Sequence, residues 1–121
     1  LGSIWISSEA QIHDEAVSLI SHLPVLISAA LLNTLSTDIN PSIYSLAKSI
    51  ASSGFADTSR VGGGNPALGV SMSKFNKANI KRHFSYYRNS LDLFEKYLLE
   101  ENWNEIEKIL INAQKERQNF I

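Results

Sequence analysis

His22 is the side chain in this sequence best suited to acid–base or hydrogen-bonding chemistry. It stands in the run Ile20-Ser21-His22-Leu23-Pro24, among apolar residues and two positions before a proline. Pro24 lacks a backbone donor and strains the preceding turn, so we expect a kink or a local break near Ser21. A neutral imidazole beside irregular backbone can donate and accept hydrogen bonds to a ligand. Two interpretations stay open here, a ligand-binding histidine and a histidine satisfied within the core.

Arg60 is the second candidate. It closes the run Asp57-Thr58-Ser59-Arg60, just before the triplet Gly62-Gly63-Gly64. A guanidinium fork beside permissive backbone suits a carboxylate or phosphate that must be held bidentately. The alternative is a loop salt bridge between Asp57 and Arg60. The glycine triplet does not match a dinucleotide fingerprint, because its spacing is wrong and no strand precedes it, so we expect a tight, flexible connection.

The other titratable groups favour structural roles. His13-Asp14 lies in an expected first helical turn, where Asp14 complements the helix dipole. His83 lies on a helix face that we expect to be solvated or at a subunit contact. The three histidines are widely spaced and no acidic triad accompanies them, so no metal site is predicted. The absence of cysteine from the sequence excludes disulfides and thiol nucleophiles.

The elements that must position His22 and Arg60 are predicted to be about five helices, an all-α fold with no sheet. The first seven residues alternate around Ile4-Trp5-Ile6, which indicates a short strand or extended lead-in from a preceding domain or linker. Ser7-Ser8-Glu9 then supplies an N-cap, and the helical domain is placed at residues 8–121. Four further helices are expected at 41–52, 66–75, 76–99 and from 104 onward, with an irregular segment at 55–64.

Composition restricts the function classes. The chain has 121 residues, of which 44% are hydrophobic and 19% charged, and this predicts one compact globular body. A net charge of −1 and a pI near 6.3 give no basic footprint, so nucleic acid is not an expected partner. The absence of cysteine fits a cytoplasmic protein, and no secretory signal is recognised at the start. The opening Leu1-Gly2-Ser3 indicates an interior cut, so we expect a fragment of a longer protein.

The segment from Ala16 to Thr37 contains no Asp, Glu, Lys or Arg and is long enough to cross a bilayer. His22, Pro24, Asn33 and four serines interrupt it. We therefore interpret it as a buried interface helix and expect no membrane partner, since helices that are apolar on every side are either membrane spans or deeply covered.

Several runs together resemble a known family. His13-Asp14, Ile20-Ser21-His22-Leu23-Pro24, the run from Ser53 to Arg60 and Asn65-Pro66 are similar, in order and separation, to the C-terminal domain of the arogenate/prephenate dehydrogenases. The run Gly-Phe-Ala-Asp-Thr-Ser-Arg-Val-Gly-Gly-Gly-Asn-Pro at 54–66 resembles the cyanobacterial arogenate type. The resemblance covers nearly the whole chain.

The resemblance implies an intertwined helical dimerisation domain of the kind found at the C-terminus of 6-phosphogluconate dehydrogenase. It also implies an NADP-dependent oxidative decarboxylation that gives L-tyrosine from arogenate, or 4-hydroxyphenylpyruvate from prephenate. The cofactor and the main catalytic histidine would belong to an N-terminal domain, so no catalytic residue is expected here and the fragment alone should be inactive. A homodimer through the 16–35 helix and neighbouring helices is expected.

Carried over by position, His22 would face the substrate, Arg60 would bind a substrate carboxylate, and Asp57 would contribute near Arg60 across the subunit boundary. Prephenate-type members often carry a second histidine where this chain has Val25, and some carry an aromatic gate where it has Gly69. These departures favour arogenate. The competing interpretation is a non-catalytic helical dimer or scaffold module in which His22 and Arg60 are only structural.

Overall fold

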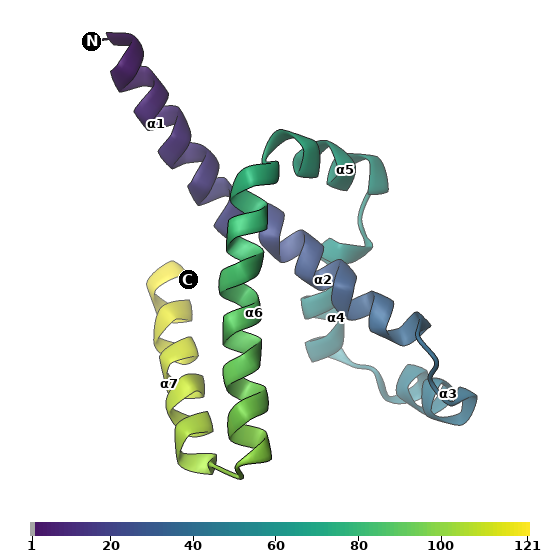
Figure 1. Cartoon of the computed structure of the whole chain (residues 1–121). Helices are drawn as coiled ribbons and strands as arrows, with labels where there is room; N and C mark the ends of the chain where they lie inside the picture. The colour runs from purple at the N-terminus through teal and green to yellow at the C-terminus, as the bar shows by residue number, and fades with distance from the viewer. Residues whose placement is uncertain (1) are drawn as a thin grey trace. The chain divides into compact units, whose positions relative to one another are not determined.

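A computed structural model of the chain describes the backbone of residues 2–121 and the side chains of residues 8–121 (Figure 1). The described residues are almost entirely helical and include no strand, which confirms the all-α prediction. The chain divides into two units, Leu1–His83 and Phe84–Ile121. The boundary falls inside one long helix, so that helix contributes its first turns to the first unit and the remainder to the second.

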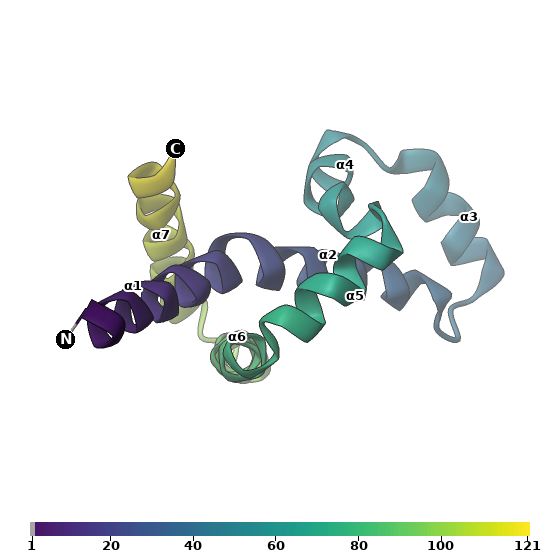
Figure 2. The ribbon, with the colours of Figure 1, turned by 90° about the horizontal axis from the view of Figure 1, so that it is seen from above.

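The central element of the first unit is a long helix in three parts. α1 (Gly2–Val17) continues through a π-helical turn (Ser18–His22) into α2 (Leu23–Asn33), and a 3₁₀ turn (Thr34–Ser36) ends it. The ribbon passes from α1 to α2 without a break in chain direction (Figure 2). The wide turn appears where Pro24 required it: the backbone N–H of Leu23 reaches back five residues to the carbonyl of Ser18, which relieves the crowding that a proline imposes on the turn before it. The backbone is irregular near Ser21, as predicted, but the irregularity is a π turn within a continuous helix and not the kink or break that was expected.

Two predictions at the start of this helix are wrong. Residues 2–7 are helical rather than extended, and the N-cap proposed at Ser7-Ser8-Glu9 falls inside α1. Three alternating residues are too few to separate a strand from a helix, and a long helix that follows can extend back through them. Leu1 lies outside the described residues. The assignment of residues 1–7 to a preceding domain or linker remains a prediction.

Three shorter helices follow. α3 (Pro41–Ile50) begins where predicted, with the Asn40 side chain accepting from the backbone N–H of Ser42 at 2.8 Å. α5 (Pro66–Phe75) begins in the same way, with Asn65 accepting from Ala67 N–H at 2.9 Å. The segment predicted as irregular is instead mostly helical, because α4 (Ser53–Ser59) and a 3₁₀ turn (Val61–Gly63) occupy it.

The serine and threonine residues of α4 explain why the sequence predicts an irregular segment there. Thr58 Oγ1 donates to the carbonyl of Gly54, and Ser59 Oγ donates to the carbonyl of Phe55, each one turn back along the helix. Residues of these types usually favour turns and caps, so a Ser/Gly-rich run suggests a loop. Here the seven-residue helix is supported by contact with α2, beside which it lies in Figure 1.

Apolar burial within this chain is sparse. Leu23 and Ile80 are the only buried hydrophobic residues among those described, whereas the buried polar ones are Ser18, His22, Ser28, Asn76 and His83. Three large apolar side chains of α3 are exposed: Ile43 is 61%, Leu46 59% and Ile50 68% exposed. On the long helix, Leu19 and Ile20 are exposed as well. A fold that leaves so many large apolar side chains in water needs cover from outside the chain.

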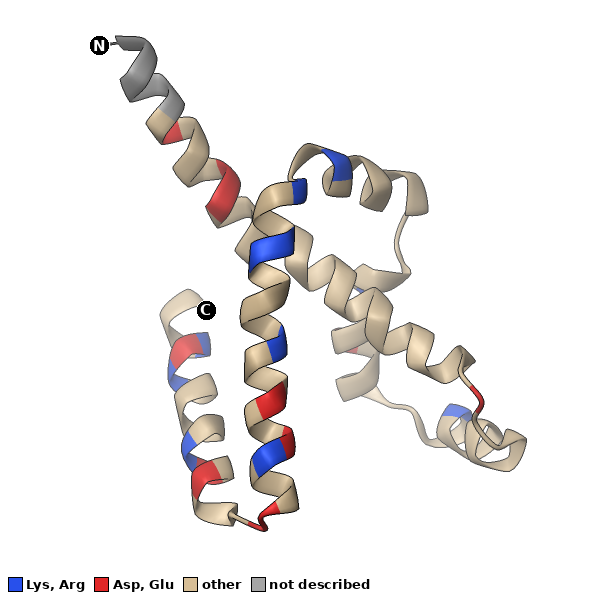
Figure 3. Cartoon of the chain, in the orientation of Figure 1, with Lys and Arg blue, Asp and Glu red and all other residues tan. Residues whose placement is uncertain are grey.

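The stretch of α2 and the π turn carries no charged side chain, as Figure 3 shows. By length and composition, one helix of the described residues, Ser8–Ser36, could cross a membrane, and only 17% of its most apolar window is buried within the chain. Core helices of soluble proteins and segments close to an N-terminus pass the same test, so this is weak evidence for a span.

The second unit is a helical hairpin formed by the rest of α6 (Lys77–Leu99) and α7 (Trp103–Phe120). The helix boundaries agree with the prediction to within one residue. Asn102 N–H donates to the Tyr97 carbonyl at 2.9 Å and Glu101 N–H to the Leu98 carbonyl at 3.1 Å, the bonding pattern of a Schellman C-cap. Asn102 then caps α7 by accepting from Glu105 N–H.

The Schellman cap of α6 generates a prediction. Glu101 occupies its left-handed position with φ of 55°, a conformation that costs an L-residue about 1 kcal/mol or more relative to glycine. We expect Glu101→Gly to raise the free energy of unfolding by about 1 kcal/mol, measured by urea denaturation. Glu100→Gly, one residue earlier and without a positive φ, is the control and should destabilise. Equal effects of the two substitutions would contradict this account of the turn.

Candidate functional site

Ser28 fixes the segment that carries Arg60. Its hydroxyl donates to the Thr58 carbonyl at 2.8 Å and accepts from the Gly62 backbone N–H at 2.9 Å, and the residue is 3% exposed. One buried side chain of α2 therefore holds the chain on both sides of Arg60. Because both partners are backbone groups, the turn between α4 and the 3₁₀ segment has little freedom to shift along the helix.

Only glycine fits at position 62, because the backbone there lies against the backbone of α2 at Ser28 and Ala29. A Cβ atom built on Gly62 would lie 2.3 Å from the Ala29 nitrogen and 2.6 Å from the Ser28 hydroxyl, distances that real atoms do not adopt. Its φ is not positive, so the constraint is space rather than backbone conformation. The predicted tight connection is confirmed for Gly62.

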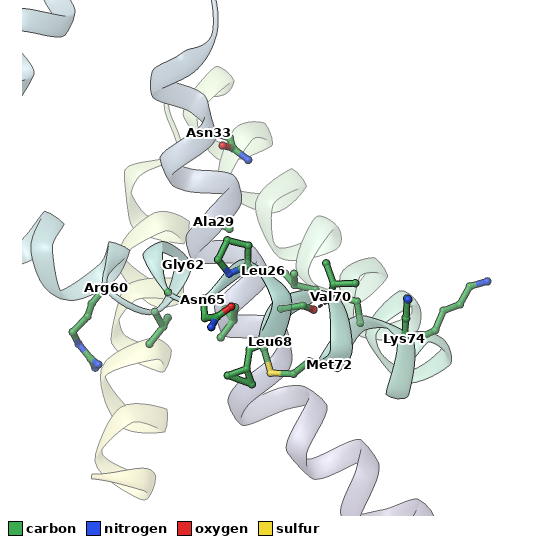
Figure 4. A pocket seen from close by; sticks show the side chains of 17 residues that line it. Leu26, Ala29, Asn33, Arg60, Gly62, Asn65, Leu68, Val70, Met72 and Lys74 are labelled. Atoms are coloured by element: carbon green, nitrogen blue, oxygen red, sulfur yellow. Dashed lines mark hydrogen bonds between the residues drawn. The ribbon is translucent and has the colours of Figure 1, made fainter.

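Arg60 lines a groove of about 1060 Å³ in the first unit (Figure 4). In that view Arg60 and Lys74 stand at opposite sides, with Leu26, Leu68 and Met72 between them. Lys77 also lines the groove, and no Asp or Glu does. The other residues that line it are largely apolar or small: Val25, Ala29, Asn33, Val61, Gly62, Gly64, Asn65, Pro66, Gly69, Val70 and Ser73. Such a groove suits a small molecule that combines an apolar body with negative charge.

The guanidinium of Arg60 is exposed and forms no ion pair with any residue that the structure describes. The alternative of a salt bridge between Asp57 and Arg60 is therefore not formed. Asp57 is exposed on α4 and does not line the groove. Since no described residue pairs with it and the groove has no acidic side chain, the Arg60 guanidinium keeps its bidentate capacity for an external anion.

His22 is 7% exposed, at the end of the π turn, and is not among the residues that line the groove with Arg60. Its Nδ1 lies 3.2 Å from Asn76 Nδ2, and the same nitrogen of Asn76 donates to the Asp14 carbonyl at 2.7 Å. A single copy of the chain thus gives the two principal candidates separate surroundings. Asn76 joins α5 to α6 and carried no signal beyond its position at a helix boundary, so the sequence did not single it out.

The expectation for His83 is wrong. It is 1% exposed, its Nδ1 lies 2.7 Å from Ser18 Oγ, and its Nε2 lies 3.7 Å from Glu15 Oε1. The order serine, histidine, carboxylate is that of a hydrolytic triad, but Ser18 is fully buried and cannot reach a substrate. The cluster joins α6 to the long helix and is structural. Among the described residues no group of three His, Asp or Glu side chains is arranged to hold a metal.

The fold and the groove together define the class of protein to which this domain belongs. This is an all-helical domain whose central helix leaves large apolar side chains exposed and whose groove is lined by basic but no acidic side chains. Residues 9–112 match the family described as "Prephenate dehydrogenase, dimerization domain", and the chain belongs to this family.

Three relatives illustrate the similarity. The chain resembles the crystal structure of Synechocystis arogenate dehydrogenase with a TM-score of 0.87 at 40% identity, covering 90% of this chain and 39% of that one. It is 28% identical over 98 residues to prephenate dehydrogenase of Bacillus subtilis (strain 168), which is 81% of this chain and 26% of the relative. The fold also matches A. aeolicus prephenate dehydrogenase, solved with hydroxyphenyl propionate and NAD+, with a TM-score of 0.80 at 22% identity, covering 92% of this chain and 38% of that one.

The chain therefore spans roughly a quarter to two-fifths of the length of these relatives. The resemblance inferred from the motifs is confirmed at the level of the family and its helical domain.

The contact between Ser28 and Gly62 generates the second prediction. Gly62→Ala places a methyl group against the α2 backbone, so we expect a loss of about 2–4 kcal/mol in the free energy of unfolding, the range of severe overpacking. Gly54→Ala is the matched control, because Gly54 is helical in α4 and nothing lies within 4 Å of its added Cβ. The control should be neutral or stabilising by up to about 1 kcal/mol. Urea denaturation of both variants tests the difference, and a neutral Gly62→Ala would refute the close approach.

Proposed function

We propose that this chain is the C-terminal domain of an arogenate (or prephenate) dehydrogenase that catalyses NADP-dependent oxidative decarboxylation to L-tyrosine (or 4-hydroxyphenylpyruvate). The observation that carries the proposal is that Arg60, which forms no ion pair with any described residue, lies at a groove with apolar walls and no acidic side chain. Arogenate and prephenate combine carboxylates with a six-membered carbon ring, which is the chemistry that such a groove accommodates.

Val25 and Gly69, the two positions that separate this sequence from the prephenate type, both line the groove. Val25 offers no hydrogen bond, and Gly69 leaves space where an aromatic side chain would narrow the groove. Together with the 40% identity to the Synechocystis arogenate dehydrogenase, these positions support arogenate as the preferred substrate.

The part of the chain that the structure describes contains no strand and therefore no glycine-rich strand–helix turn, so these residues do not fit a dinucleotide site of the Rossmann kind. The proposal places NADP mainly on a separate N-terminal domain, where it would accept the hydride. The residues of this chain would orient the substrate. Arg60 would hold a substrate carboxylate, His22 would donate a hydrogen bond, and Asp57 would act near Arg60 from across the subunit boundary.

We also propose that the protein is a cytoplasmic homodimer joined through the 16–35 helix and neighbouring helices. The exposed apolar residues of that helix, including Leu19, Ile20 and Leu31, form the surface a second copy would cover. We prefer a second copy to a lipid bilayer because Ser18, His22 and Ser28 of the same helix are buried against polar groups of this chain. A dimer would bring two sets of His22, Asp57 and Arg60 into one particle.

The test of the substrate role is Arg60→Ala in the full-length protein, assayed in steady state with arogenate and NADP. Loss of a charge-assisted hydrogen bond of about 1.5–3 kcal/mol predicts a fall of roughly ten- to a hundredfold in kcat/KM. Arg60→Lys keeps the charge without the fork and should fall between wild type and Arg60→Ala. Arg88→Ala, which removes an exposed arginine of α6, is the control.

An unchanged KM for arogenate in Arg60→Ala would remove Arg60 from the site. The other candidate function, a non-catalytic helical dimerisation or scaffold module, is also supported by the exposed apolar helix, and it predicts no turnover of arogenate or prephenate by the wild-type protein. Parallel assays with prephenate and with NAD decide the substrate and the cofactor.

The dimer proposal is tested with Leu31→Glu, which places a charge on the apolar surface of α2. We expect the dimer dissociation constant to rise at least about tenfold, because an unpaired charge is costly to bury. Gln11→Glu introduces the same side chain at an exposed polar position outside residues 16–35 and should leave the dimer dissociation constant unchanged. Sedimentation velocity over a concentration series gives both constants. A wild-type protein that is monomeric throughout would exclude the homodimer.

A further inference from the structure

A continuous series of polar contacts leads to His22 from the first turns of α6. Arg82 forms an ion pair with Glu15, and its Nη2 also donates to Asn79 Oδ1 at 2.7 Å. Asn79 Nδ2 donates in turn to Asn76 Oδ1 at 2.8 Å. Asn76 Nδ2 then lies 3.2 Å from His22 Nδ1. All of these residues belong to the first unit.

Only one assignment of donors and acceptors along this series of contacts is consistent. The second partner of Asn76 Nδ2 is the Asp14 carbonyl, at 2.7 Å, and a carbonyl oxygen can only accept. The oxygen of the same amide is occupied by the donor from Asn79, whose own oxygen accepts from Arg82, a side chain with no acceptor. The nitrogen of Asn76 must therefore be the atom that faces His22. Since an amide nitrogen donates, His22 Nδ1 accepts.

An imidazole that accepts at Nδ1 carries its proton on Nε2. Nε2 of His22 has no hydrogen-bond partner among the described residues. Every fully buried side-chain nitrogen or oxygen among these residues has a hydrogen-bond partner. Because His22 Nε2 has none, it cannot be fully buried, and it must lie in the part of this 7%-exposed residue that solvent reaches. His22 is thus a buried ring with one accessible N–H.

Asn76 is well placed to enforce this arrangement. It is 4% exposed, and its side chain is held by the Asp14 carbonyl and by Asn79, so it cannot reorient without losing both bonds. His22 is held from the other direction by the π turn that Pro24 requires. Backbone and side chain together leave the ring a single orientation and a single tautomer.

We propose that Asn76 is a positioning residue that fixes His22 as the Nε2–H tautomer, so that His22 acts as a hydrogen-bond donor to an oxygen of the bound substrate. This rests on the proposed function, in which His22 faces the substrate. A donor at Nε2 suits the carboxylate or carbonyl oxygens of arogenate or prephenate, whereas the opposite tautomer would present a lone pair to them.

The test combines a spectroscopic signature with kinetics in the full-length protein. In wild type labelled with ¹⁵N-histidine, and with the His22 signals assigned by their loss in His22→Gln, we expect the protonated nitrogen to be Nε2. Asn76→Asp keeps the size of the side chain but replaces the donor with an acceptor, so the proton should move to Nδ1. With arogenate and NADP, kcat/KM should fall about ten- to a hundredfold.

Two further variants sharpen the result. Asn89→Asp makes the same chemical change at an exposed position of α6 and should alter neither the tautomer nor kcat/KM. Asn76→Ala removes the donor without adding an acceptor, so His22 should populate both tautomers and kcat/KM should fall less than in Asn76→Asp. A merely structural Asn76 would instead produce equal losses in both variants with no change of tautomer.

A wild-type spectrum with the proton on Nδ1 overturns the proposal even if Asn76→Asp fails to fold. So does an active Asn76→Asp enzyme with unchanged kcat/KM. Failure of the proposed function is recognised separately, because the wild-type protein would then show no turnover of arogenate or prephenate with either NADP or NAD.

Discussion

The first unit is organised by polar groups buried along one helix. Ser18 bonds to His83, His22 to Asn76, and Ser28 to the backbone on both sides of Arg60. Each bond attaches a different segment, and with only two buried hydrophobic residues described in the chain, little apolar packing is available to hold those segments instead. Buried hydrogen bonds are directional and costly to leave unmade, so they fix register more strictly than apolar contact does. Placement of both candidate residues depends on this constraint.

The same helix also carries apolar side chains that this chain by itself does not cover. Its buried polar residues Ser18, His22 and Ser28 have partners within the chain, while apolar residues such as Leu19, Ile20 and Leu31 are exposed. Helices that are apolar on several sides are usually covered by another surface, and membership of a dimerization-domain family supports the proposal that this surface is a second copy. In such an arrangement the stability of the fold and the completeness of the site depend on the same contact, since Asp57 is proposed to act across it.

The π turn connects Pro24 with the orientation of His22. Pro24 cannot support a regular turn, and the widened turn that results ends at His22. Asn76 then meets the ring from another part of the chain. Neither feature alone would select one tautomer: the turn orients the ring, and the amide determines which nitrogen carries the proton. The Arg82–Glu15 ion pair lies on the surface and contributes little energy by itself, but it anchors the amides that reach His22.

The sequence by itself determined the helical class, the breaks at Asn40-Pro41 and Asn65-Pro66, the distortion before Pro24, and the family, because capping, proline geometry and apolar period are local properties. It also selected His22 and Arg60 from their types and neighbours. It misjudged α4 and residues 2–7, where weak local preferences were overridden by the adjoining helix or by contact with α2. Only the tertiary structure revealed the roles of Ser28, Asn76 and His83. The partners that tie them to distant segments lie between 30 and 68 residues away in the chain, and no local pattern specifies which distant groups a buried polar side chain will meet.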